Sequence, residues 1–176
     1  MRNWLIIISM CFGWVLISSA SPPLTNAPAV IELPDQFEQM QKLSFPNTNL
    51  TLLTIADRKG SEQIAGWVEP VKKQFGDQIN VQGIADVSAV PRLLRGTVRS
   101  AFRKKQSYPV MMDWSGETVE KFMPIADQVS IFVISEKGAI LRRFDGPVKP
   151  EELEEVRTVI ETHLSQTPAT KPAKLP

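Results

Sequence analysis

The chain has 176 residues, of which 43% are hydrophobic and 22% are charged. This composition suits one globular domain with tails, and a core of that size needs no disulfide bonds for support. The formal net charge is +1, and a chain so close to neutral gives no global reason to expect nucleic acid or an anionic surface as a partner.

The first twenty residues contain the three parts of a secretory signal peptide. A short basic start, Met1–Asn3, precedes an almost unbroken apolar run, Trp4–Ile17, and the small residues Ser18–Ala20 follow. We therefore predict a signal peptide over residues 1–20 with cleavage after Ala20. This predicts a periplasmic or secreted protein that contacts a membrane only through the signal segment. An uncleaved anchor is the alternative, although the run is shorter than the ~20 residues of a membrane span.

Cys11 is the only cysteine of the chain, and it lies inside this apolar run. A lipid-modified cysteine would end such a run, whereas more apolar residues follow Cys11, which disfavours a lipoprotein. Cleavage after Ala20 would leave a mature chain without cysteine. We therefore expect neither thiol-disulfide oxidoreductase nor peroxidase activity.

Proline-rich segments flank the region that has a regular hydrophobic pattern. Residues 21–29 predict a flexible lead-in, and residues 166–176 predict a disordered tail. The remaining residues, 30–165, predict one domain without internal repeats.

The first half of this domain alternates between strand and helix. The apolar run 50–56 predicts a strand. Apolar residues then recur at helical spacing over 61–75, with Ser61 as the expected N-cap and a kink expected at Pro70. A strand over 79–85 and a helix over 90–105 follow. The expected apolar face of the second helix is Leu94, Val98, Ala101 and Phe102.

In the second half of the domain, the pattern predicts a β-hairpin between two helices. Its expected elements are a strand over 109–112, a short helix over 117–124, strands over 129–135 and 139–144, and a last helix from Pro150. Buried parallel strands with crossover helices, followed by a hairpin and a closing helix, predict a three-layer α/β domain with a central mixed sheet.

Three strings, taken with this order of elements, resemble the thioredoxin superfamily. Leu33–Phe37 followed by Leu43–Phe45 is similar to the N-terminal hairpin of redoxins, Tyr108–Asp113 to their edge strand, and Phe132–Ile140 to their β-hairpin. The chain thus resembles the redoxin branch of exported thiol-disulfide proteins and peroxiredoxins over residues 30–165. The resemblance implies a three-layer thioredoxin-like fold with an N-terminal redoxin-type hairpin.

The chemical hallmarks that the resemblance implies are missing. Many members carry a proline in the first helix, and matching it to Pro70 places the two cysteines of their Cys-x-x-Cys motif at Glu62 and Ala65. Their cis-proline before the hairpin strand would fall at Val129, and nothing matches the peroxidatic cysteine of peroxiredoxins. The resemblance therefore supports the fold and argues against the usual activity, and we predict no catalytic residue.

Polar side chains near the ends of the parallel strands are candidates for binding a ligand, because ligands bind there in open α/β sheets. These candidates are Asp57, Arg58, Lys59, Ser61, Glu62, Asp86 and Asp113. The three aspartates could hold Mg²⁺ or Ca²⁺ or supply a general base, and the loop at Lys59 could bind an anion. Aspartate is also common where strands turn into loops, and the sequence does not show convergence, so we predict no metal and no cofactor.

Four arginines fall on one face of the helix over 90–105: Arg92, Arg95, Arg99 and Arg103. They are candidates for docking an acidic partner or lipid headgroups, and the alternative is an ordinary solvated face. His163, the only histidine, is expected at the edge of the buried stripe of the last helix, in a packing role.

The leading hypothesis is an exported, catalytically silent thioredoxin-like domain that binds a protein or small-molecule partner at the strand-end cleft. The first alternative is an accessory component of an extracytoplasmic redox system that acts through the arginines. The second is a metal- or carboxylate-dependent enzyme that uses the aspartates. No nucleic acid partner is expected.

Overall fold

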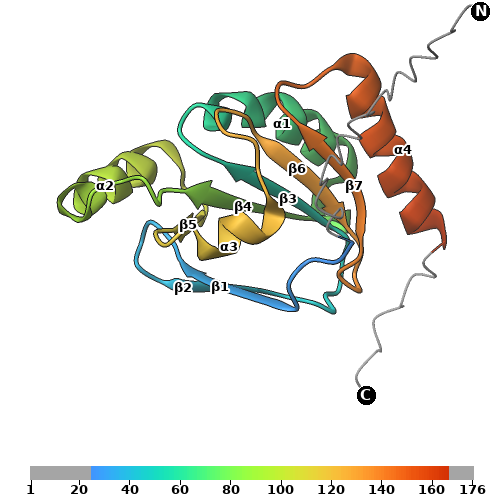
Figure 1. Ribbon diagram of the computed structural model, residues 1–176. Helices are drawn as coiled ribbons and strands as arrows, with labels where there is room; N and C mark the ends of the chain where they lie inside the picture. The colour runs from blue at the N-terminus through green and yellow to red at the C-terminus, as the bar shows by residue number, and fades with distance from the viewer. Residues whose placement is uncertain (1–24, 167–176) are drawn as a thin grey trace, which may run out of the picture.

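The computed structural model describes residues 25–166, which form a five-stranded sheet and a separate two-stranded hairpin (Figure 1). The strands are β1 (Val30–Pro34), β2 (Met40–Ser44), β3 (Thr51–Ala56), β4 (Asn80–Asp86), β5 (Met111–Asp113), β6 (Ser130–Ile134) and β7 (Ile140–Asp145). The helices are α1 (Ile64–Phe75), α2 (Arg95–Lys105), α3 (Glu117–Phe122) and α4 (Pro150–Gln166). The strand order in the large sheet is β5-β4-β3-β6-β7. Strands β3, β4 and β5 are parallel, whereas β6 and β7 are antiparallel to their neighbours, which confirms the predicted mixed sheet.

Strands β3 and β6 lie at the centre of the sheet and divide their side chains between two cores. Every residue of both strands is buried, as expected for strands covered on both faces. Leu53 and Phe132 face a core that is closed by the hairpin and α3. Leu52 and Ile131 face the opposite core, which α1 and α4 cover. Figure 1 shows these helices on one side of the sheet and the hairpin with α3 on the other, which confirms the three layers.

The edge strand β5 and the residues before it are covered by the β1–β2 hairpin. The backbone N–H of Val110 donates to Gln36 Oε1 at 2.9 Å, and Gln36 Nε2 donates to the carbonyl oxygen of Tyr108 at 2.7 Å. Gln36 is itself fully buried. An uncovered strand edge can pair with another chain. The Gln36 amide occupies backbone groups just before β5 and so protects this edge of the sheet.

Helix α2 lies at one end of the molecule and makes fewer apolar contacts than predicted (Figure 1). Val98 and Phe102 pack against a small core that contains Met112. The expectation of buried Leu94 and Ala101 was wrong, since Leu94 is 52% exposed and Ala101 is exposed. Only Val98 and Phe102 of the predicted apolar face therefore pack against the domain.

The described part of the predicted lead-in, residues 25–29, is held against the β6–β7 turn. Asn26 and Ala139 form an antiparallel bridge, and the N–H of Ala27 donates to the carbonyl oxygen of Gly138 at 2.8 Å. Residues 26 and 27 of the predicted lead-in therefore make defined backbone contacts. Helix α4 includes Gln166, the first residue of the predicted tail. The predicted signal peptide and the rest of the tail lie outside the described residues.

Within residues 25–166, none of the helices has the length and apolar character needed to cross a membrane.

Candidate functional site

The loop between β3 and α1 is hydrogen-bonded to the loop that precedes β6. Asp57 Oδ2 accepts from the backbone N–H of Asp127 at 2.7 Å, and Lys59 Nζ contacts Asp127 Oδ2 at 2.7 Å. Gln63 Nε2 donates to the carbonyl oxygen of Asp127, and Gln63 Oε1 accepts from the N–H of Val129, both at 3.2 Å. The hydrogen bond to Asp127, helped by its charge, raises the pKa of Lys59. The two loops therefore form one cross-linked unit.

Gly60 brings the two backbones into direct contact. A Cβ atom at this position would lie 2.5 Å from the carbonyl carbon and oxygen of Gln128, which is closer than side-chain atoms approach a backbone. Gly60 is buried, whereas Glu62 and Ala65 are exposed. The resemblance assigns the missing cysteines to Glu62 and Ala65 and the missing cis-proline to Val129. Between these positions in the sequence, Gln63 is hydrogen-bonded to the N–H of Val129.

The start of the helix differs from the prediction. A 3₁₀ turn, Gly60–Gln63, precedes α1, and Ser61 is not its N-cap. Ser61 Oγ donates instead to the carbonyl oxygen of Arg58 at 2.6 Å, and Asp57 Oδ1 accepts from the N–H of Gly60 at 2.8 Å. Asp57 therefore closes the turn that we assigned to Ser61. Helix α1 continues through Pro70.

The three strand-end aspartates do not form a common site. Asp86 and Asp113 are paired in the β4–β5 register, but Asp86 Oδ1 accepts from the N–H and hydroxyl of its own neighbour Ser88, at 3.0 and 2.7 Å. Asp57 is used by the loop contacts above. Among residues 25–166, no three histidine, cysteine or acidic side chains lie close enough together to hold a metal ion. The described residues therefore offer no metal cluster to the metal-dependent alternative.

Asp113 is fully buried and organises the turn into α3. Its Oδ1 accepts from the N–H of Ser115, the hydroxyl of Ser115 and the N–H of Gly116, and its Oδ2 accepts from the N–H groups of Thr118 and Val119 at 2.9 Å each. Burial opposes the charged form, but these hydrogen bonds outweigh it and hold the pKa of Asp113 below its usual value. The residue is thus a structural anion and is not placed to bind a ligand.

The arginines of α2 are divided between the protein and the solvent. The guanidinium groups of Arg95 and Arg99 lie 4.9 and 5.2 Å from the ring centre of Trp114, within the range of cation–π attraction. Arg99 also forms an ion pair of 2.6 Å with Glu38 in the β1–β2 turn. Arg92, with Arg103 at the other end of the helix, is exposed. The predicted stripe of four therefore contributes two free cations and two that fix α2 to the domain.

The spacing of the arginines indicated their common face, but it did not reveal the partner of Arg95 and Arg99. Trp114 follows a strand end, and only the fold brings it under α2. In the same way, the sequence placed His163 at the edge of α4 without its partner. In the structure His163 Nε2 lies 2.6 Å from Glu136 Oε2 in the β6–β7 turn, so its role includes a polar contact as well as packing.

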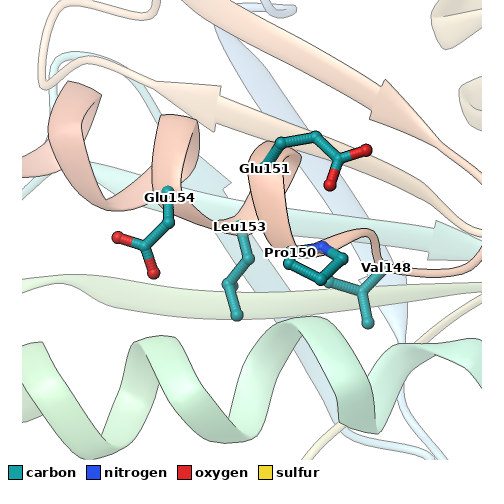
Figure 2. A pocket seen from close by; sticks show the side chains of 5 residues that line it. All are labelled: Val148, Pro150, Glu151, Leu153 and Glu154. Carbon is teal, nitrogen blue, oxygen red and sulfur yellow. The ribbon is translucent and has the colours of Figure 1, made fainter.

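An open groove lies where α4 begins, beside α1 (Figure 2). It is lined by Val148, Pro150, Glu151, Leu153 and Glu154. Figure 2 shows Leu153 and Val148 directed toward the neighbouring helix, with the carboxylates of Glu151 and Glu154 on either side of them. The groove therefore combines an apolar floor with two carboxylates.

No protein-family model matches the chain, and no curated protein matches it in sequence. Solved structures do match. A protein assigned as the thiol:disulfide interchange protein DsbE of Chlorobium tepidum superposes with a TM-score of 0.61 at 15% identity, over 81% of this chain and 99% of that one. The exposed lipoprotein thioredoxin of Streptococcus pneumoniae has a TM-score of 0.59 at 16% identity, over 76% of this chain and 99% of its own.

Peroxidoxin BcpB of Mycobacterium tuberculosis matches with a TM-score of 0.56 at 16% identity, over 82% of this chain and 99% of that chain. The superpositions establish the architecture, but at identities this low they leave the activity open. The agreement with all three structures, together with the mixed sheet and its layers, shows that this chain has a thioredoxin-like fold.

Proposed function

We propose that the chain is an exported thioredoxin-fold protein that acts by binding a partner and catalyses neither thiol-disulfide exchange nor peroxide reduction. The observation that carries the proposal is the cross-linked pair of loops at the position of the family's redox site. Thiol-disulfide exchange needs a reactive thiolate that a substrate can approach. Here Glu62 and Ala65 stand where the thiols would be, and Gly60 packs on the backbone of Gln128.

Export is supported by the N-terminal sequence pattern and by one structural neighbour. Residues 1–20 have the order of a signal peptide, and the pneumococcal thioredoxin of the same fold is an exposed lipoprotein. An oxidising compartment would also suit a domain that has no free thiol to protect.

Two surfaces compete for the role of binding face. At the strand ends, Asp57, Asp86 and Asp113 already accept hydrogen bonds from nearby loop groups. Lys59 and Ser61 are exposed but are bonded within the loops, so Arg58 and Glu62 are the exposed side chains that remain for a partner. On α2 and the turn before it, the exposed residues are Arg92, Leu93, Leu94, Arg103, Lys104 and Lys105, which we call the α2 surface. Because its side chains are not committed elsewhere, the α2 surface is the better candidate.

A thiol turnover assay tests the catalytic part of the proposal. We expect the chain to give no acceleration of insulin reduction by dithiothreitol and no peroxide consumption, while a thioredoxin in the same assay is active. The Cys11→Ser full-length chain is the matched control, because it removes the only thiol in the sequence. Robust turnover by the wild-type chain would overturn the proposal, and its loss in Cys11→Ser would assign that activity to an uncleaved N-terminus.

A further inference from the structure

The charges of the domain are strongly separated. Residues 25–166 contain 17 basic and 19 acidic side chains, and the stretch 87–112 holds 6 of the basic ones and none of the acidic ones. The other described residues therefore carry a net charge of −8 against +6 on this stretch. A molecule that is almost neutral overall is thus polarised, with α2 at its positive end, and such a field orients it toward an anionic surface.

Exposed apolar side chains accompany this positive charge. Leu93, in the turn that leads into α2, is 97% exposed, and Leu94 is 52% exposed. Tyr108, which follows α2, is 55% exposed. Phe37, 40% exposed, belongs to the β1–β2 turn, and the ion pair between Glu38 and Arg99 fixes that turn to α2. Apolar residues set among lysines and arginines are typical of surfaces that lie at a membrane interface.

We propose that the α2 surface docks the domain on an anionic phospholipid bilayer. This inference rests on the proposed binding function and names the partner of its binding face. Arg92, Arg103, Lys104 and Lys105 would meet lipid phosphates, while Leu93 would enter the acyl boundary. Arg95 and Arg99 keep α2 rigid through Trp114 and Glu38 and so present the surface.

Shape favours a bilayer over an acidic protein. Figure 1 shows α2 at the outer end of the domain, away from the layers that cover the sheet. A projecting leucine with basic neighbours can enter a fluid lipid layer without any matching pocket, whereas a protein partner would have to supply one. Clustered lysines and arginines contribute roughly 1 kcal/mol each near an anionic leaflet, so the four free cations of the α2 surface are sufficient for reversible docking.

The test is sedimentation with vesicles, using the chain from Ser21, which retains every described residue. We expect it to bind vesicles of phosphatidylglycerol and phosphatidylcholine at low salt, to be released by high salt, and not to bind phosphatidylcholine alone. Lys104→Glu/Lys105→Glu should weaken binding about tenfold or more. Leu93→Ala should weaken binding several-fold. This weakening should persist at intermediate salt, because salt does not screen the burial of an apolar side chain.

The matched control is Lys72→Glu/Lys73→Glu, which changes the net charge equally. Lys72 and Lys73 are exposed in the last turn of α1. Lys104 and Lys105 are exposed in the last turn of α2, so the two pairs have matching positions. Equal loss of vesicle binding in both double variants would overturn the inference. Absence of binding to anionic vesicles would also overturn it, and would make an acidic protein the better candidate partner for the α2 surface. Neither result involves thiol turnover, so the proposed lack of catalysis would stand or fall separately.

Discussion

The carboxylate of Asp57 joins the end of β3 to the loop before β6, because it accepts a hydrogen bond from the N–H of Asp127 at 2.7 Å. Its other oxygen accepts from the N–H of Gly60 at 2.8 Å. One side chain thus orders both loops at the position where the resemblance places a redox site.

Replacing Asp57 by Ala should lower the free energy of unfolding by about 1–3 kcal/mol, because two backbone donors lose their acceptor. Urea denaturation of both proteins measures the difference. Asp77→Ala is the control, since Asp77 is exposed and the change there should stay within about 0.5 kcal/mol. Equal stability of the two variants would contradict the structural role of Asp57.

Gly60→Ala should be more harmful than a glycine substitution usually is. The added methyl group would meet the backbone of Gln128 at 2.5 Å, and backbone cannot move aside as a flexible side chain can. We expect a loss of about 2–4 kcal/mol, within the range for overpacked sites.

Gly96→Ala supplies the opposite control within the same chain. Gly96 lies in α2, and a Cβ atom there would meet nothing within 4 Å. Since alanine favours helix over glycine, this change should stabilise the protein by about 0.5–1 kcal/mol. Thermal unfolding of both variants should therefore shift in opposite directions, and a Gly60→Ala protein as stable as the wild type would show that the two loops are not in contact.

The fold could be predicted further than the site could. The apolar runs that became β3 and β6 are visible in the sequence, because central strands are buried on both faces and need no alternation. The contact of Gln63 with Val129 joins residues 66 positions apart. No local pattern announces such a hydrogen bond, because it depends on how the sheet brings the two loops together.

The strand-end aspartates and the α2 surface were only partly predictable for the same reason. The sequence offered the strand-end aspartates as ligand-binding candidates, with a turn role as the alternative. Whether their carboxylates converge depends on side-chain orientation, which the sequence does not contain. For α2, helical spacing identified the arginine face. It could not show that Arg95 and Arg99 would pack on the ring of Trp114. Nor could it show that Leu93 and Leu94 would be exposed.

Asp113→Asn should destabilise the protein in a pH-dependent way. An amide in place of Oδ2 would present N–H groups to the donors of Thr118 and Val119, which should cost about 2–4 kcal/mol near neutral pH. Because the folded-state pKa of Asp113 is lowered, its stabilisation is present above the unfolded-state pKa of about 4 and is lost as the pH falls through the folded-state value.

Urea titrations at pH 7 and pH 3 check this sign, since the gap between wild type and Asp113→Asn should narrow at pH 3. Asp86→Asn is the control, because Asp86 is bonded only to Ser88 and should cost under about 1 kcal/mol at either pH. A gap that widens on acidification would mean that Asp113 is protonated in the folded protein.

The mature form of the protein should begin at Ser21 and contain no cysteine. The reason is the order of basic start, apolar run and small residues that ends at Ala20, which is the arrangement that a signal peptidase reads. Intact-mass spectrometry of the protein from its own exported fraction measures the cleavage point directly. Treatment with a thiol-alkylating reagent should add no mass to this form. A mass that retains Cys11 would contradict cleavage and would support an anchored chain or, with a lipid attached, a lipoprotein. In that case the vesicle experiment with the chain from Ser21 would still decide whether the α2 surface binds lipid by itself.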